Sequence, residues 1–170
     1  SKKVFRAYGL PVAKTDMATT EDEAVKLAKE IGFPVVLKIV SPDILHKSDA
    51  GGVKVNIKDE AGVREHYQKI LNNAKNYKAN ADIHGIVVQE MAPWATETII
   101  GSVNDPTFGA TVMFGLGGIF VEVLKDVTFR VAPISEKEAS TMMDEIRGAP
   151  ILEGTRGEAP RDKKALAAVL

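Results

Sequence analysis

A single lysine interrupts an otherwise apolar segment in the first half of the chain. Lys38 stands within the run VVLKIV at residues 35–40, which is typical of a buried strand because it is short and rich in β-branched residues. An ammonium group inside such a strand is costly unless it finds a partner. Lys38 therefore either faces solvent from an edge strand or projects into a cleft to hold an anion, and lysine suits phosphate.

A polar loop with two glycines follows that strand directly. It reads SPDILHKSDAGG at residues 41–52. Glycines let a backbone approach a ligand closely, and successive N–H groups form a concavity that binds anions. His46 lies among Lys47, Ser48 and Asp49, so it is a candidate for phosphoryl acceptance or for acid–base work. A polar surface turn is the alternative, because two adjacent glycines are weak evidence alone.

Two later segments carry further polar groups. Gln89, Glu90 and Met91 end an apolar strand, where main-chain groups could bind the edge of an adenine, although a strand running into a connection explains them equally well. Residues 114–130, FGLGGIFVEVLKDVTFR, place Glu122, Asp126 and Arg130 close to a glycine-rich turn. We interpret this segment as the wall of a polar cleft, in which a guanidinium could form a fork with phosphate oxygens.

The elements around these residues fall into two groups. In the first group, Thr20 and Glu23 form a capping box, and a second helix begins after Asp59. The strands expected with these helices cover residues 35–40, 53–57 and 85–91.

After Pro93 short strand candidates follow one another closely, which favours an antiparallel sheet. We expect strands at residues 96–103, 108–114, 119–124 and 127–132. A second capping box, Ser135 with Glu138, opens a helix to about Arg147; residues 148–160 are loop-like, and a last helix begins near Ala165. We therefore expect two lobes, residues 1–92 and 93–170.

Composition excludes several classes of function. The 170 residues carry 22 Lys+Arg against 23 Asp+Glu, a net charge of -1, which argues against a nucleic-acid partner. No apolar run approaches the roughly 18 residues of a membrane span. With no cysteine, the chain has no thiolate metal site and no cysteine nucleophile, and it fits a reducing cytoplasm.

Several of these segments together resemble a known family. The stretches IGFPVVLK at 31–38, SPDILHKSDAGGV at 41–53, VQEMAP at 88–93 and residues 114–130 are similar to the ATP-grasp domain of ADP-forming (NDP-forming) acyl-CoA synthetases. Among these, the β subunits of the acetate–CoA ligases are the nearest in pattern. The resemblance covers nearly the whole chain. It implies an α+β protein with the ATP-grasp fold, in which two α/β lobes carry mainly antiparallel sheets.

The resemblance also implies an activity and its partners. Members of this family convert acyl-CoA, ADP and phosphate into acid, CoA and ATP. They bind ATP or ADP with Mg²⁺. They use a phosphohistidine on a CoA-binding α subunit or on its fused equivalent, so we expect a hetero-oligomer.

By the same resemblance, the nucleotide contacts fall on matching positions of this chain. Lys38 holds the phosphates, the loop covers them, Glu90 and Met91 meet the adenine, and Glu97 lies near the ribose. His46 matches a loop histidine that relays the phosphoryl group. The full set of expected nucleotide contacts is Lys38, Lys47, Ser48, Asp49, Gly51, Gly52, Glu90, Met91, Glu97 and Arg130.

One departure concerns the metal. The family holds Mg²⁺ through a late segment containing Asn-Pro, which does not occur here. We expect those ligands to lie beyond residue 170 and the chain to be part of a longer one. We do not assign Glu122 and Asp126 as metal ligands instead of the missing ones.

Two functions therefore remain open. The chain belongs either to the nucleotide-binding part of an acyl-CoA ligase or to a non-catalytic ATP-grasp module fused to a protein acetyltransferase. Retention of both Lys38 and His46 favours the ligase. The activated acid, the choice between ATP and GTP, and a separate or fused chain stay undetermined.

Overall fold

A computed structural model describes residues 2–155 and 157–170 of the chain. The chain divides into two compact units, Ser1–Pro93 and Trp94–Leu170, each with its own apolar core. Among the described residues, no helix combines the length and the apolar character needed to cross a membrane.

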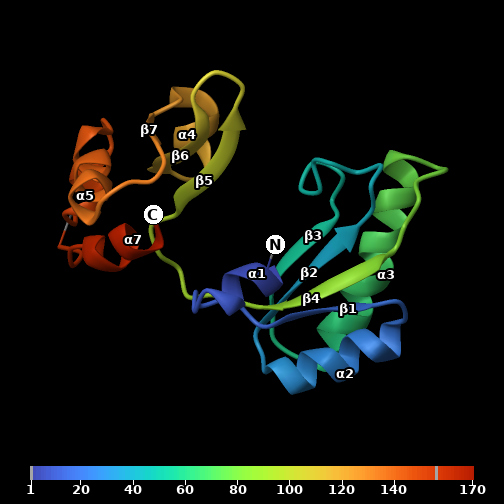
Figure 1. Ribbon diagram of the computed structural model, residues 1–170. Helices are drawn as coiled ribbons and strands as arrows, with labels where there is room; N and C mark the ends of the chain where they lie inside the picture. Colours follow the sequence, from blue (N-terminus) through green and yellow to red (C-terminus); the bar gives the residue numbers. More distant parts are fainter. Residues whose placement is uncertain (1, 156) are drawn as a thin grey trace. The chain divides into compact units, whose positions relative to one another are not determined.

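The first unit is built on a four-stranded antiparallel sheet (Figure 1). Its strands are β1 (Thr15–Ala18), β2 (Val35–Val40), β3 (Val53–Ile57) and β4 (Gly85–Glu90), in the spatial order β1-β4-β2-β3. Strand β2 is therefore internal and pairs with β4 on one side and β3 on the other. Lys38 stands opposite Val87 of β4 and Val53 of β3, so it is not an edge-strand lysine.

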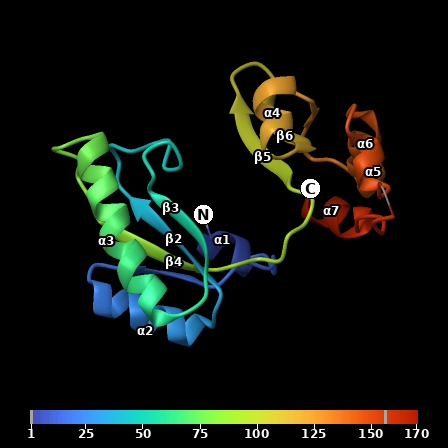
Figure 2. The same cartoon turned by 180° about the vertical axis from the view of Figure 1, so that it is seen from behind.

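Two helices cover one face of this sheet, as both ribbon views show (Figures 1 and 2). These are α2 (Glu21–Ile31) and α3 (Glu60–Tyr77). Alternate residues of β2, such as Leu37 and Ile39, are fully buried beneath them. Because side chains alternate along a strand, Lys38 points to the opposite face, where the short helix α1 (Lys2–Ala7) contributes Lys2.

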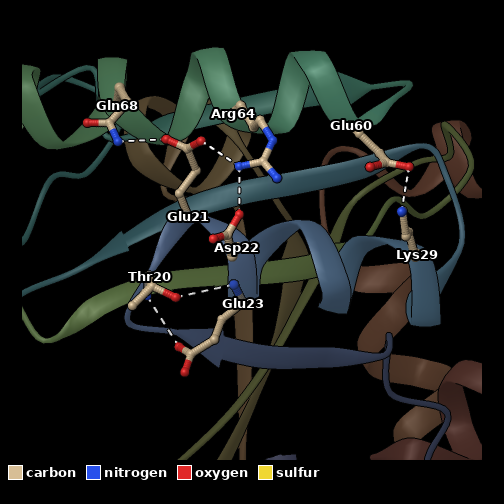
Figure 3. A network of polar contacts seen from close by, with 8 residues as sticks. All are labelled: Thr20, Glu21, Asp22, Glu23, Lys29, Glu60, Arg64 and Gln68. Atoms are coloured by element: carbon tan, nitrogen blue, oxygen red, sulfur yellow. Dashed lines mark hydrogen bonds and ion pairs between the residues drawn. The ribbon is translucent and has the colours of Figure 1, made fainter.

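Polar contacts fasten the two covering helices to each other (Figure 3). The predicted capping box of Thr20 and Glu23 is present at the start of α2. Arg64 of α3 reaches Glu21 at 2.8 Å and Asp22 at 2.7 Å, while Gln68 donates to the second oxygen of Glu21. A surface ion pair joins Lys29 to Glu60 at 2.6 Å. These contacts link α3 to α2 at the surface, although exposed pairs of this kind each contribute little stability.

The second unit has a three-stranded antiparallel sheet, and three of its helices share an apolar core with it (Figure 1). Its strands are β5 (Thr98–Asp105), β6 (Gly109–Leu116) and β7 (Val127–Val131), in that spatial order. The helices are α4 (Ile119–Leu124), α5 (Glu136–Glu145), α6 (Ala149–Leu152) and α7 (Lys163–Val169), of which α5, α6 and α7 share that core. Phe114 and Leu116 of β6 are buried with Met142 and Met143 of α5, and the capping box of Ser135 and Glu138 is confirmed.

One expected strand is a helix. Residues 119–124 form α4 instead of a fourth strand of the sheet, because a six-residue apolar run has no periodicity that separates strand from helix. Gly118 turns the chain with φ +61°, and Lys125 ends the helix in the left-handed region at φ 49°. The sequence analysis also missed β1 and the four-residue α6, which are too short to show a pattern.

Asp126 provides a test of this architecture. It is buried, and its two carboxylate oxygens accept the backbone N–H groups of Arg147 at 2.8 Å and Gly148 at 2.7 Å. Asp126→Ala leaves both donors unpaired, so we expect the free energy of unfolding to fall by about 1–3 kcal/mol. Urea unfolding measures this. The control is Asp144→Ala, which removes an exposed pair with Lys163; equal losses in the two variants would contradict the structural role of Asp126.

Candidate functional site

Two lysine ammonium groups converge on one neutral oxygen on the open face of the first sheet. Nζ of Lys38 and Nζ of Lys2 each lie 3.3 Å from Oε1 of Gln89, so the two nitrogens lie within twice that distance of each other. Gln89 is carried by β4, two residues after the strand partner of Lys38. The pairing of β2 with β4 therefore places the amide beside the ammonium.

The charge of this cluster is not neutralised by an acidic partner. Within residues 2–155 and 157–170, no carboxylate forms an ion pair with Lys2 or Lys38. Burial lowers the pKa of Lys2 from its usual value, and the charges of Lys38 and Arg6 lower it further. Excess positive charge around a neutral amide favours an anionic ligand.

A second feature of the cluster is an unpartnered hydroxyl. Thr15 is the strand partner of Gln89, so it shares its face of the sheet. Its Oγ1 is buried and has no hydrogen-bond partner among the described residues. The face of the sheet that carries Gln89 therefore includes one buried hydroxyl without a partner in the described chain.

The loop of residues 41–52, which we call the His46 loop, returns beside Lys38. Its last residues lead into Val53, the β3 partner of Lys38, and the N–H of Ile39 donates to the carbonyl of Gly52 at 2.8 Å. On its amino side, Asp43 pairs with Lys78 at 2.5 Å and accepts the N–H of Asp82 at 2.7 Å. These two bonds lower the pKa of Asp43, the backbone donor more strongly.

Two buried apolar side chains anchor the loop in the core. Ile44 and Ala50 belong to the cluster beneath the sheet, whereas the residues between them are mostly exposed. His46, Ser48 and Asp49 lie on this exposed part, with Lys47 half-buried. The loop is thus held in the core on both sides of His46, while the side chain of His46 is exposed.

The glycine pair has a packing role that the sequence analysis did not foresee. A Cβ added to Gly52 would lie 2.5 Å from Cγ2 of Ile39, and one added to Gly51 would lie 2.6 Å from Nδ2 of Asn73. Both distances are shorter than real side chains allow. The glycines therefore let the loop pack against β2 and α3, whatever ligand it also covers.

The expected adenine-binding connection is partly engaged within the first unit. The N–H of Glu90 donates to the carbonyl of Lys14 at 2.8 Å, and its carboxylate accepts the N–H of Lys14 at 3.0 Å. The N–H of Met91 donates to the carbonyl of Pro34 at 3.3 Å. Both N–H groups are therefore already hydrogen-bonded within the first unit, and the adenine-binding role of Glu90 and Met91 stays a prediction.

Glu97 lines a cavity of about 500 Å³ in the second unit. Its carbonyl accepts the N–H of Gly117 at 2.8 Å, and a Cβ added to Gly118 would lie 3.2 Å from its carboxylate. Thr96, which directly precedes Glu97, accepts a 2.8 Å hydrogen bond from Nε of Arg161, which also pairs with Glu158. The start of this unit is thereby tied to the segment after α6.

Arg130 is engaged with a carboxylate of its own unit. Its Nη2 lies 2.5 Å from Oε1 of Glu145, and its Nη1 donates to Thr128 and to the carbonyl of Phe129. Asp126 caps backbone N–H groups instead of lining an open cleft. The side chain of Glu122 lies outside the described residues. A phosphate contact by Arg130 would require exchange with Glu145 and remains a prediction.

No metal centre is formed by the residues that the structure describes, because no three His, Cys, Asp or Glu side chains gather in them. We therefore assign no Mg²⁺ ligand in this chain.

The structure brings some of the expected residues together and leaves others apart. Lys38 and the His46 loop belong to the first unit, where the loop leads into the strand partner of Lys38, whereas Glu97 and Arg130 belong to the second and occupy different places there. The sequence analysis missed Lys2 and Arg161. No local pattern could have indicated them, because their contacts join residues 87 and 65 positions apart.

The family of the chain follows from comparison with known proteins. A family model described as the ATP-grasp domain matches residues 1–170. The β subunit of acetate–CoA ligase [ADP-forming] I from Pyrococcus furiosus is 54% identical over 170 residues, which are all of this chain and 73% of that subunit. The chain thus belongs to the ATP-grasp family, alongside the β subunits of ADP-forming acetate–CoA ligases.

Two further proteins extend this similarity. The 4-hydroxybutyrate–CoA ligase [ADP-forming] of Nitrosopumilus maritimus is 52% identical over 161 residues, 95% of this chain but only 23% of that longer protein. Acetyl-coenzyme A synthetase 1 of Ca. Korarchaeum cryptofilum, solved with coenzyme A and Ca-AMPCP, matches with a TM-score of 0.95 and 53% identity over 99% of this chain and 74% of that one. Another structure of that enzyme contains Mg-AMPPCP, with its phosphohistidine segment pointing towards the nucleotide binding site; it matches with a TM-score of 0.84 and 48% identity over 99% of this chain and 72% of that one.

The pair of Arg130 and Glu145 predicts a pH dependence of stability. Hydrogen bonds from Arg130 and then Thr128 lower the pKa of Glu145. A carboxyl whose folded pKa is depressed stabilises the protein above its unfolded pKa of about 4.3, and this contribution is lost as the pH falls through the folded pKa. Glu145→Gln should therefore flatten the loss of stability below about pH 5.

Chemical unfolding at a series of pH values tests this, with Arg130→Met as the paired variant. In the Arg130→Met background, Glu145→Gln should change the slope of the free energy of unfolding against pH much less. An unchanged slope in the single variant Glu145→Gln would show that the pair does not shift the titration of this carboxyl.

Proposed function

We propose that this chain is the nucleotide-binding part of an ADP-forming acid–CoA ligase, with acetate as the first candidate acid. In this proposal it exchanges a phosphoryl group between ATP or ADP and a histidine. The observation that carries the proposal is the pair of ammonium groups on Gln89, with no carboxylate partner in the described chain. The His46 loop leads into Val53, the β3 partner of Lys38. The matching relatives are ligases, which favours this function over a non-catalytic module.

Lys38 and Lys2 are proposed to bind the polyphosphate of the nucleotide. Neutralising phosphate charge is the main contribution that a protein makes to phosphoryl transfer. Gln89 keeps the two ammonium groups in place before the nucleotide arrives, so little reorganisation accompanies binding. The remaining expected contacts, from Lys47 to Gly52, lie on the His46 loop that ends beside Lys38.

His46 is proposed as the phosphoryl acceptor on this chain. An unprotonated ring nitrogen attacks the terminal phosphorus of ATP, so that an N–P bond forms while the bridging O–P bond breaks. The electron pair of that bond leaves with ADP, and the other ring nitrogen loses its proton. An exposed position on a pinned loop suits this role, because the imidazole reaches the nucleotide and then a partner.

The metal and the partner are proposed from the relatives. The enzyme from Ca. Korarchaeum cryptofilum binds Mg-AMPPCP, and we propose that Mg²⁺ accompanies the nucleotide here, where it would neutralise phosphate charge. A β subunit implies an α subunit, so we propose a CoA-binding α subunit, or its equivalent in a fused chain, as the partner.

Replacing Lys38 tests the phosphate site. Lys38→Met removes a charged hydrogen bond worth about 1.5–3 kcal/mol, so the Kd for ADP should rise by roughly 10- to 100-fold. Calorimetric titration of the full-length protein measures it. The control Lys26→Met removes an exposed lysine of α2 that pairs with Glu30, and it should leave the Kd unchanged. An unaltered Kd in Lys38→Met would remove this lysine from the site.

Replacing His46 tests the relay. The full-length protein incubated with γ-labelled ATP and Mg²⁺ should acquire a label that acid removes and base does not. His46→Ala should lose it, whereas His84→Ala, which removes an exposed ring paired with Asp82, should keep it. A label that persists in His46→Ala would exclude His46 as the acceptor.

A further inference from the structure

A side chain of helix α3 holds the backbone of the His46 loop. Nδ2 of Asn73 donates to the carbonyl of Gly51 at 3.0 Å. Gly51 lies five residues after His46, in the left-handed region at φ +60°. The contact therefore joins the loop to α3, a helix whose buried residues pack in the core of the first unit.

Besides the bond from Ile39 of β2 to the carbonyl of Gly52, the main-chain bonds near Gly51 are internal to the loop. The N–H of Gly51 donates to the carbonyl of Ser48 at 3.0 Å, and that of Gly52 donates to Lys47 at 2.7 Å. Such bonds shape the turn, but they do not determine where the turn sits on the protein. On the carboxyl side of His46, the Asn73 amide supplies a polar link from the loop to a rigid element, as Asp43 does on the amino side.

The surroundings of Asn73 show why an amide suits this position. A cleft of about 170 Å³ is lined by Gly51, Asn73 and the basic side chains of Lys54, His66 and Lys69. An isosteric carboxylate at residue 73 could not donate to the Gly51 carbonyl, and the basic groups would attract it away. An alanine at residue 51 would bring a Cβ to 2.6 Å from Nδ2 of Asn73.

We propose that Asn73 is a positioning residue for phosphoryl transfer, which holds the His46 loop at the distance where the imidazole meets the nucleotide. This inference rests on the proposed function, because it takes His46 as the acceptor. A small displacement of a reacting group costs up to roughly 100-fold in rate. Loss of the Asn73 contact therefore slows transfer more than it weakens nucleotide binding.

The test compares Asn73→Asp with Asn72→Asp in the full-length enzyme with its partner subunit or domain. Residue 72 is the exposed neighbour on the same helix, so the control makes the same chemical change without touching the loop. Three quantities are measured: the rate of phosphohistidine formation on this chain, the KM for ATP, and hydrogen exchange at the amides of Ala50, Gly51 and Gly52.

We expect Asn73→Asp to slow phosphohistidine formation by about tenfold or more and to speed exchange at the three amides, while the KM changes by less than about threefold. Asn72→Asp should match the unmodified enzyme. A rate within about twofold of the control overturns the proposal, as does a loss of rate without faster exchange. A merely structural role would lower the folded fraction and leave the rate per folded molecule unchanged.

A second pair of variants keeps the proposal testable if Asn73→Asp folds poorly. Gly51→Ala forces the loop away from Asn73, and Asn73→Ala removes the obstruction. The loss of rate in the double variant should therefore be smaller than the product of the two single losses, and independent effects would contradict the contact. If His46→Ala itself keeps its label, the proposed function has failed, but the exchange measurement still decides whether Asn73 holds the loop.

Discussion

The candidate site is built around one electrostatic arrangement, in which an amide side chain holds an ammonium group on the face of the first sheet opposite α2 and α3. Lys38 lies on an internal strand, so its backbone is fixed by β3 and β4, and its side chain can project only away from the helices. Gln89 supplies an oxygen but no negative charge. A carboxylate in that place would neutralise the lysine and weaken its attraction for an anion. The amide keeps the side chain ordered and the charge available.

The groups around Lys38 follow from this arrangement. Lys2 binds the same oxygen, which concentrates positive charge on one face of the first unit. The His46 loop begins at the end of β2 and ends at the strand partner of Lys38, so its position is set by the same sheet. The helices contribute from the other face, where α3 bonds to the loop through Asn73. The proposed phosphate contacts and the proposed phosphoryl acceptor thus share one scaffold, while the cavity beside Glu97 belongs to the second unit.

Local features of the sequence predicted much of this molecule. Both capping boxes are confirmed, because each depends on residues three positions apart. The strands around Lys38 were also recognisable from their apolar pattern. The antiparallel α+β class and the ATP-grasp family are confirmed by the sheets and by the match over residues 1–170.

The features of the fold and of the candidate site that the sequence analysis missed depend mainly on contacts between residues far apart in the chain. Lys2 joins the site only because α1 reaches Gln89, and Arg161 meets Thr96 only once the second unit has folded. The glycine pair was interpreted through ligand approach, whereas its packing against Ile39 and Asn73 became visible only in three dimensions. Residues 119–124 were misassigned because a short apolar run does not separate strand from helix, and the turn at Gly118 that takes the chain out of the sheet is a property of the backbone.

The most direct test is a crystal structure of the full-length protein with ADP and Mg²⁺. The account predicts phosphate oxygens within hydrogen-bonding distance of the ammonium groups of Lys38 and Lys2, with the His46 loop alongside them. A nucleotide bound elsewhere, with Lys38 still on Gln89 and no phosphate near it, would contradict the account.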